Sequence, residues 1–183
     1  MPTMVASEQF LKPKDILLAT GIAQGMRIAD LGCGSGYITK VAARLVGPTG
    51  VVFAADIKRP ILQQLERDAF ALGFSNIHTV WTDLEIIGAT NIAPDSIDIT
   101  CLVNVLFLSH HKDLMIQEAV RLTKQGGRVL VVDWKRTNTP FGPLPDERVD
   151  MRMVDEIATK SGLVKIDSFE AGTYHDARVY RKS

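Results

Sequence analysis

Three alternating glycines mark the stretch whose residue types are best suited to chemistry. In residues 29–37, ADLGCGSGY, an apolar run stops at Asp30 and leads into Gly32, Gly34 and Gly36. Because glycine has no β-carbon, such a loop can take positive φ values and let a ligand lie against its backbone N–H groups. An ordinary strand-to-helix turn usually needs one glycine, so three of them predict a ligand-binding loop.

The spacing of these glycines separates two classes of ligand. A dinucleotide-binding loop has the pattern G-x-G-x-x-G, but Tyr37 stands here where its third glycine would be. An NAD-dependent oxidoreductase is therefore the less favoured interpretation. The pattern G-x-G-x-G, preceded by Asp30, instead resembles motif I of the class I S-adenosylmethionine-dependent methyltransferases, which bind the methionine end of the cofactor at this loop. The resemblance implies cofactor contacts from Asp30, Gly32, Cys33, Gly34, Gly36 and Tyr37.

Two further carboxylates follow in the order that this resemblance implies. Asp56 ends the apolar run 51–55, about 20 residues beyond the loop, where an acid can accept hydrogen bonds from both ribose hydroxyls. The alternative role for Asp56 is to cap the helix expected over 59–72. In the family resembled, an acid after the third strand binds the adenine amino group and an apolar neighbour packs on the ring, and Asp83 and Leu84 match. A plain turn aspartate is the alternative for Asp83.

Residues near the end of the fourth strand are candidates for the remaining roles. Asn104 is expected either to line the pocket or to cap the strand, and Ile57, beside the ribose acid, is expected to contact the cofactor. His110 and His111 are the candidates for removing a proton from the acceptor near neutral pH. The alternative is that both histidines are simply solvated at a helix start.

Residues 135–147 are expected to cross the site as an active-site loop, since the prolines and the glycine in them exclude regular structure. Strands four and five end near Asn104 and Asp133, so the segments that follow must lie over the same edge of the sheet. The expected substrate contacts are Asp133, Trp134 and Arg148. Arg148 suits an anionic substrate group, with an ion pair to Asp150 as the alternative.

The elements that position these residues follow from hydrophobic periodicity. Helices are expected over 13–23, 37–46, 59–72, 110–122 and 146–161. Strands are expected over 26–31, 51–55, 76–80, from 97 into an irregular stretch ending at 108, and over 128–134, 163–171 and 176–182, the last two forming a hairpin. The resemblance implies an α/β fold, a Rossmann-like three-layer α/β/α sandwich. Its mostly parallel seven-stranded sheet has the order 3-2-1-4-5-7-6, with an antiparallel last strand.

Composition sets limits on the class of protein. The 183 residues are 46% hydrophobic and 23% charged, which suits a single domain over 1–183 with an N-terminal helical extension over 1–25. A formal net charge of +0 gives no sign of nucleic-acid or anionic-membrane binding, so a small-molecule or protein substrate is favoured. We find no apolar run near the roughly 20 residues of a membrane span and no leader pattern, and therefore expect a cytoplasmic monomer or homodimer. Cys33 and Cys101 have no metal-ligand or disulfide spacing, so no metal is expected.

The resemblance covers nearly the whole chain and implies an enzyme that transfers a methyl group from S-adenosylmethionine to a small-molecule acceptor, leaving S-adenosylhomocysteine. Residues 131–135, followed by Gly142-Pro143, are similar to a subgroup that includes quinone-biosynthesis C-methylating enzymes. Two alternatives stay open. A protein carboxyl methyltransferase of the isoaspartyl type has a similar 34–37 stretch, and a non-catalytic S-adenosylmethionine-binding module would keep the same cofactor residues.

Overall fold

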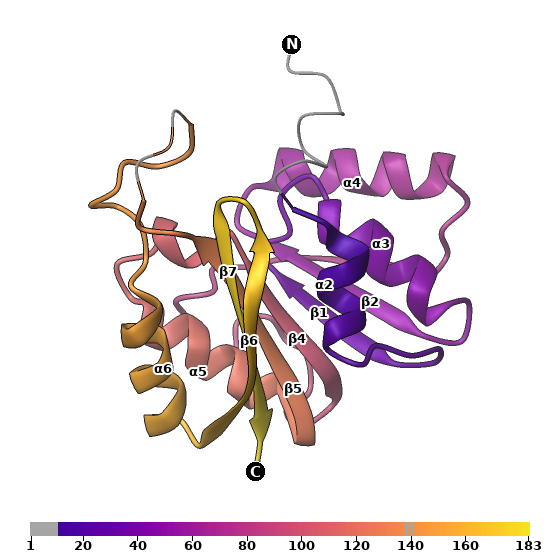
Figure 1. The fold of residues 1–183 in the computed structure, drawn as a ribbon. Helices are drawn as coiled ribbons and strands as arrows, with labels where there is room; N and C mark the ends of the chain where they lie inside the picture. Colours follow the sequence, from indigo (N-terminus) through magenta and orange to yellow (C-terminus); the bar gives the residue numbers. More distant parts are fainter. Residues whose placement is uncertain (1–10, 138, 140) are drawn as a thin grey trace.

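The fold is built on one seven-stranded sheet, seen in a computed structural model that describes residues 11–137, 139 and 141–183 (Figure 1). The strand order is β3-β2-β1-β4-β5-β7-β6, as expected from the sequence. The strands are β1 (Arg27–Leu31), β2 (Val51–Asp56), β3 (Ile77–Trp81), β4 (Ile97–Val103), β5 (Thr123–Trp134), β6 (Leu163–Gly172) and β7 (His175–Lys182). The α-helices are α2 (Pro13–Ala19), α3 (Tyr37–Val46), α4 (Arg59–Ala71), α5 (Lys112–Leu122) and α6 (Met151–Lys160), with a 3-10 turn η1 at Leu106–Leu108.

The direction of the strands also matches the prediction. β1 pairs in parallel with β2 on one side and β4 on the other, and β2 with β3 and β4 with β5 are parallel too. The last strand, β7, is antiparallel to both β5 and β6, so the expected terminal hairpin is confirmed. Buried apolar runs such as those of β1 and β4 are typical of parallel strands that are covered on both faces.

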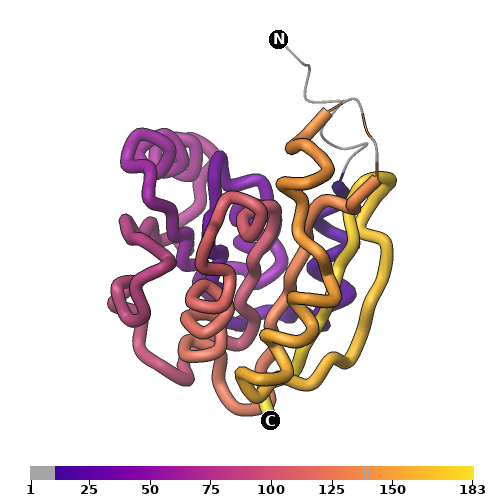
Figure 2. Tube along the Cα trace, turned by 90° about the vertical axis from the view of Figure 1, so that its left-hand side faces the viewer, coloured from indigo at the N-terminus to yellow at the C-terminus, as the bar shows by residue number. Residues whose placement is uncertain are grey.

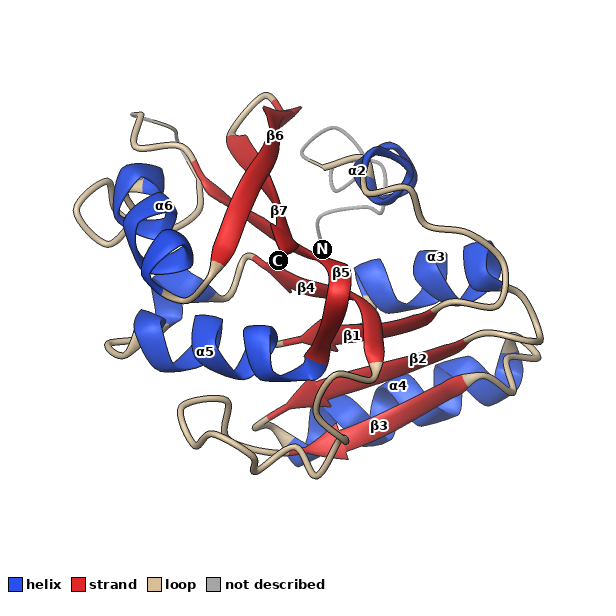
Figure 3. Ribbon diagram, turned by 90° about the horizontal axis from the view of Figure 1, so that it is seen from below, coloured by secondary structure: helices blue, strands red, loops and turns tan. Residues whose placement is uncertain are grey.

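Helices cover both faces of the sheet and give the three-layer sandwich (Figures 2 and 3). On one face, side chains of α2, α3 and α4 pack against alternate residues of the strands, for example Ile28 and Val52. On the other face, α5 and α6 pack against the intervening residues, such as Ala29 and Leu31. This alternation is what a strand period of two requires when both faces are buried.

The sheet opens a crevice where its connections diverge. From β1 the chain moves outward to β2 and β3, whereas β4, on the other side of β1, leads outward to β5. Loops that leave the carboxyl ends of β1 and β4 therefore separate, and α/β sheets bind their ligands in such a crevice. The predicted residues at the strand ends are thus brought to one edge of the sheet.

Several predicted boundaries differ from the structure for local reasons. The last helix begins at Met151 and not at 146, because the Asp150 side chain accepts the Arg152 backbone N–H and caps it there. The helix expected from residue 110 begins at Lys112. β5 begins at Thr123, before the predicted 128, and its register with β4 shifts between Thr123 and Arg128.

The first helix, α2, ends at Ala19, before the predicted 23. Residues 1–10 of the predicted N-terminal extension lie outside the described residues. Within the part of the chain that is described, no helix has the length and apolar character needed to cross a membrane.

Candidate functional site

A cavity of about 420 Å³ lies at the carboxyl edge of the sheet, where β1, β2, β3 and β4 end. It lies at the crevice that the strand order creates. The residues that line it are Gly32, Gly34, Asp56, Ile57, Lys58, Ile61, Thr82, Asp83, Leu84, Glu85, Asn104, Val105, Leu108, Ser109 and Met115. Residues from four separate strand ends, predicted individually from the sequence, therefore surround one space.

The glycine loop forms one wall of this cavity. Gly34 has φ 51°, and a β-carbon on it would meet nothing within 4 Å, so the space above it is open to a ligand. Gly32 has φ 77°, and a β-carbon there would overlap the Val105 side chain. One glycine thus leaves room for a ligand, while the other lets the loop pack against the segment after β4.

Four backbone N–H groups of the glycine loop are paired within the protein. The N–H groups of Gly32 and Cys33 both donate to the Ala55 carbonyl, at 2.8 and 3.0 Å. The Gly36 N–H donates to the Cys33 carbonyl at 2.9 Å, and the Gly34 N–H donates to Asp56 Oδ2 at 3.0 Å. These donors are already paired within the protein, so they do not form the N–H cradle that a pyrophosphate requires.

Asp56 lies at the tip of β2 with its half-buried carboxylate on the cavity wall. Its Oδ2 accepts the Gly34 N–H, and its Oδ1 accepts the Lys58 N–H at 2.9 Å. The N-cap of α4 is Lys58, without a side-chain capping bond, so Asp56 is not the cap of that helix. Each oxygen has further acceptor capacity, which leaves the carboxylate able to accept from a diol. Ile57 is 56% exposed at the rim.

Asp83 and Leu84 lie together on the wall that follows β3. Asp83 Oδ1 accepts the Glu85 N–H at 2.9 Å, which holds the carboxylate in a turn beside the cavity. Leu84 is buried and belongs to the core on the α5 side of the sheet. The pair offers one hydrogen-bond acceptor and one apolar surface, the combination that an adenine ring uses.

Asn104 provides an observation that points directly to a ligand. Its side-chain oxygen Oδ1 is buried and has no hydrogen-bond partner, although the residue lines the cavity. The backbone takes φ 52°, a conformation uncommon outside glycine, and its N–H donates to the Val132 carbonyl at 2.8 Å. A buried acceptor without a partner is costly, so this oxygen suits a donor supplied by a bound molecule.

Four residues expected to contact the cofactor are near the cavity but do not line it: Asp30, Cys33, Gly36 and Tyr37. Asp30 is 2% exposed and accepts the Thr39 hydroxyl, and burial raises its pKa to about 6. The Tyr37 hydroxyl donates to the Leu11 carbonyl at 3.0 Å, toward the segment before α2. Burial raises the pKa of the Cys33 thiol, which argues against a reactive thiolate.

Asp133 and Trp134 end β5 away from this cavity. Asp133 is fully buried, and its carboxylate accepts the backbone N–H groups of Phe107 and Trp134 at 3.4 and 2.8 Å. Burial raises the pKa of Asp133 to about 6, although these backbone bonds oppose the shift. Trp134 packs against His175 with ring centroids 4.3 Å apart and ring planes tilted by 45°, and it lines a second cavity of about 720 Å³. This second cavity contains charges of both signs and none of the glycine-loop residues.

Arg148 has a different role from the one expected. The side chain is buried, and its guanidinium donates to the backbone carbonyls of Lys135, Thr137, Phe141 and Pro143 and to the Thr139 hydroxyl. These bonds use all five of the N–H groups that a guanidinium has. Arg148 therefore ties together the described residues of the 135–147 loop, and Asp150 pairs with Arg152 and Arg136 in place of Arg148.

His110 and His111 are both exposed, and neither lines the cavity. The His111 N–H donates to the Ser109 hydroxyl at 2.9 Å, and Ser109 itself lines the cavity. The structure thus places the two histidines next to the site and not in it.

Several residues that line the cavity were not predicted from the sequence. Lys58 and Ile61 lie at the start of α4, and Thr82 and Glu85 flank the adenine-side pair. Val105, Leu108 and Ser109 lie between β4 and α5, and Met115 lies in α5. Apart from their closeness to predicted positions, these residues carry no sequence signal, because apolar and small polar residues are also the ordinary components of loops and cores.

Comparison with known proteins identifies the family. A family model described as "Methyltransferase domain" matches residues 22–167. The chain belongs to this methyltransferase family. The ubiquinone/menaquinone biosynthesis C-methyltransferase of Hahella chejuensis is 30% identical over 150 residues, covering 81% of this chain and 58% of that protein. An arsenite methyltransferase of Aquipseudomonas alcaligenes is 33% identical over 121 residues, covering 64% of this chain.

The chain spans only part of the length of these relatives, 58% of the first and 35% of the second. Among solved structures, a SAM-dependent methyltransferase from Aquifex aeolicus superposes with a TM-score of 0.89 over 97% of this chain and 93% of that one. At 20% sequence identity, this likeness shows the fold.

The residues around this cavity fit S-adenosylmethionine, the cofactor expected from the sequence. Open space above Gly34, an acceptor at Asp56 and the unpartnered Asn104 oxygen are three separate features that a bound molecule would use. Because the described loop amides are paired internally, an amino-acid end fits this loop better than a pyrophosphate does.

Proposed function

We propose that the chain is an S-adenosylmethionine-dependent methyltransferase that acts on a small-molecule acceptor. The single observation that carries the proposal is the buried, unpartnered Asn104 oxygen in a cavity that also contains Gly34 and Asp56. Membership of the methyltransferase family and the relatives described above support the same class of reaction.

In this proposal each wall of the cavity binds one part of the cofactor. Asp56 accepts the ribose hydroxyls, Asp83 accepts the adenine amino group, and Leu84 packs on the ring. Gly34 leaves room for the methionine end, beside Asn104, and Gly32 lets the loop pack closely against Val105. The other expected contacts, from Asp30, Cys33, Gly36 and Tyr37, are proposed to act by shaping the loop, since these residues lie just behind the wall.

When bound, the cofactor supplies an activated sulfonium methyl group, so strong acid–base residues are optional. The protein residues have to align the acceptor atom with the methyl group and exclude water. The 135–147 loop is proposed as the acceptor-side wall. Asp133 and Trp134 hold the start of this loop, and Arg148 holds its backbone carbonyls in place. His110 and His111 are proposed to take a proton where the acceptor must lose one, because they directly follow the cavity residue Ser109.

Calorimetry with S-adenosylhomocysteine, S-adenosylmethionine and NAD tests the cofactor. We expect binding of the two S-adenosyl compounds and none of NAD. Comparable or tighter binding of NAD would overturn the proposal.

Transfer of a labelled methyl group to a metabolite extract then tests catalysis and separates the alternatives. Label in a small molecule supports the proposal. Label in protein carboxyl groups would favour the isoaspartyl-type alternative, and S-adenosylmethionine binding without any transfer would favour a non-catalytic module. Replacement of residues 138–145 by a Gly/Ser linker is expected to preserve cofactor affinity and to slow transfer at least tenfold, which is about 1.4 kcal/mol in the barrier.

The wider setting is also part of the proposal. We propose a single domain over 1–183 that works in the cytoplasm as a monomer or homodimer, without a nucleic-acid partner or a metal. Two buried free cysteines and a formal net charge of +0 support this assignment.

A further inference from the structure

The connection from β3 to β4 is unusual for a parallel sheet. A crossover of this kind usually contains a helix, which pairs its own backbone groups. Residues 82–96, all of them described, form turns and no helix. Some of its backbone groups pair in local turns, as the Ala89 N–H does with the Ile86 carbonyl, and others take partners from elsewhere in the protein.

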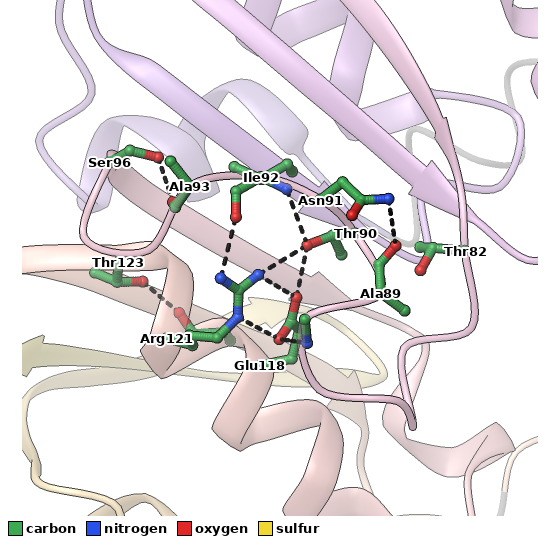
Figure 4. Close-up of polar contacts among 12 residues, drawn as sticks. Thr82, Ala89, Thr90, Asn91, Ile92, Ala93, Ser96, Glu118, Arg121 and Thr123 are labelled. Carbon is green, nitrogen blue, oxygen red and sulfur yellow. Dashed lines mark hydrogen bonds and ion pairs between the residues drawn. The ribbon is translucent and has the colours of Figure 1, made fainter.

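Glu118 supplies the main anchor for this segment from the buried face of α5 (Figure 4). The residue is 0% exposed. Its Oε2 accepts the Gly88 backbone N–H at 2.8 Å, and its Oε1 accepts the Thr90 hydroxyl at 2.6 Å. Arg121, one turn later in α5, donates to both oxygens at 2.8 Å. The carboxylate is thus fully engaged between its own helix and the crossover segment.

Arg121 holds the same segment at two more points. Its guanidinium donates to the Ile92 carbonyl and to the Thr90 hydroxyl, both at 3.0 Å. Burial alone would raise the pKa of Glu118, but the bonds from Arg121, Thr90 and Gly88 hold it below its usual value, so the carboxylate is charged. We call Gly88, Thr90, Glu118 and Arg121 the Glu118 clasp.

A buried ion pair of this kind contributes little to stability, because desolvation offsets the attraction between the charges. An apolar pair on α5 would fill the space equally well, but it could not hold the backbone of a crossover without a helix. The clasp is therefore better explained by the position that it imposes on the segment than by the stability that it adds.

The clasped segment and α5 meet at the cofactor cavity. The segment begins with Thr82, Asp83, Leu84 and Glu85, all of which line the cavity. From α5, Met115 also lines it, one turn before Glu118. The Ser109 hydroxyl donates to Glu85 Oε1 at 2.5 Å, which ties the start of the segment to the stretch before α5. The clasp thus fixes how far the adenine-side wall lies from α5.

We infer that Glu118 and Arg121 are positioning residues that hold the adenine-side wall of the cavity and so set the selectivity of the protein for adenine. The inference rests on the proposed function, because it assigns that wall to the adenine base. Neither residue touches the cavity itself, so their effect is transmitted through the segment 82–92.

The experiment compares S-adenosylhomocysteine with S-inosylhomocysteine, which carries a carbonyl where adenine has its amino group. Thr90→Val removes one clasp hydroxyl with little change of shape. It is expected to weaken S-adenosylhomocysteine binding about fivefold, while S-inosylhomocysteine binding changes less than about twofold, since the lost bonds order only the adenine-reading wall. Thr100→Val is the matched control, because its hydroxyl is equally buried but bonds Thr123 inside the sheet. We expect this control to leave the ratio of the two affinities unchanged.

Glu118→Gln is the second variant. It places an amide donor against the donors of Gly88 and Arg121, so it should reduce the preference for S-adenosylhomocysteine over S-inosylhomocysteine further than Thr90→Val does. Hydrogen exchange of the Gly88 amide in the free protein gives a readout without any ligand, and both variants should speed it. An unchanged affinity ratio in Thr90→Val, or a wild-type protein that binds both compounds equally, would overturn the inference. Failure of the wild-type protein to bind either compound would overturn the proposed function. In that case the hydrogen exchange still tests the clasp, because an unchanged exchange rate of the Gly88 amide in both variants would refute it.

Discussion

Asp30 gives a prediction whose sign and size follow from its surroundings. The side chain ends the apolar part of β1, is 2% exposed and accepts a hydrogen bond from the Thr39 hydroxyl at 2.5 Å. Burial raises its pKa from 3.8 to about 6, the Thr39 bond lowers it in part, and the nearby charge of Asp56 raises it further. The folded protein therefore holds a proton on Asp30 at pH values where the unfolded chain has released it.

This difference makes stability depend on pH. Because the pKa is raised in the folded state, burial of the Asp30 carboxyl does not lower the free energy of unfolding below pH 3.8, where the group is protonated in both states. The free energy of unfolding then falls progressively as pH rises to about 6. Each pKa unit corresponds to about 1.4 kcal/mol, so the shift amounts to about 3 kcal/mol at neutral pH. Asp30→Asn removes the charge in both states and keeps an oxygen that can accept the Thr39 hydroxyl.

Urea unfolding of wild type and Asp30→Asn, measured at steps between about pH 4 and pH 7.5, tests this reasoning. The variant should become more stable relative to wild type as pH rises, by about 3 kcal/mol at most, with the change complete shortly above pH 6. Asp113→Asn, at an exposed carboxylate in the first turn of α5, is the control for loss of one negative charge. A constant difference over this range, or one that favours wild type as pH rises, would show that Asp30 is not the buried acid described.

Three further predictions concern the site. Asp56→Ala should weaken S-adenosylhomocysteine binding by about 1.5–3 kcal/mol, and Asp83→Ala should weaken it less, because a charged acceptor that binds two hydroxyls contributes more than one adenine contact. Calorimetry measures both affinities. A larger loss in Asp83→Ala would show that the ribose and adenine roles of the two residues are exchanged. Arg148→Lys should destabilise the 135–147 loop by about 1–3 kcal/mol, because lysine cannot supply five donors in one plane. Hydrogen exchange measures the effect, and it should become faster in this loop and nowhere else. Gly32→Ala should lower the free energy of unfolding by more than about 1 kcal/mol, because it adds the strain of a positive φ and an overlap with the Val105 side chain. Thermal unfolding measures this change. Equal stability of the variant and wild type would contradict the packing of Gly32 against Val105.

Much of the fold was predictable because periodic apolar runs and turn residues determine it locally. The alternation of strands and helices, the glycine loop after β1 and the terminal hairpin all follow from such patterns, and the structure contains each of them. Errors fell at boundaries that one side chain decides. The start of α6 depends on the capping bond of Asp150, and nothing in the apolar spacing distinguishes 146 from 151 as the first turn.

Cavity residues were predictable where they lie at or just after a strand end, as Gly34, Asp56, Asp83 and Asn104 do. The role of Arg148 was not predictable, because its five partners are backbone carbonyls and a hydroxyl of the preceding loop. The spacing of residues in the sequence does not indicate how such a loop folds. Glu118 did leave a signal, as an acid among the apolar residues of a helix face. That signal indicates a buried partner, but it does not identify the backbone of residues 88–92 as that partner.

The reversed direction of β7 has a practical consequence. A parallel seventh strand would end at the same edge of the sheet as the cavity. Because β7 runs the other way, it starts at His175, beside the end of β5, and ends at Lys182 on the opposite edge, where Figure 1 places the C-terminus. A biotin or a surface linker attached at Ser183 should therefore tether the molecule to a sensor chip with the cavity turned toward solution.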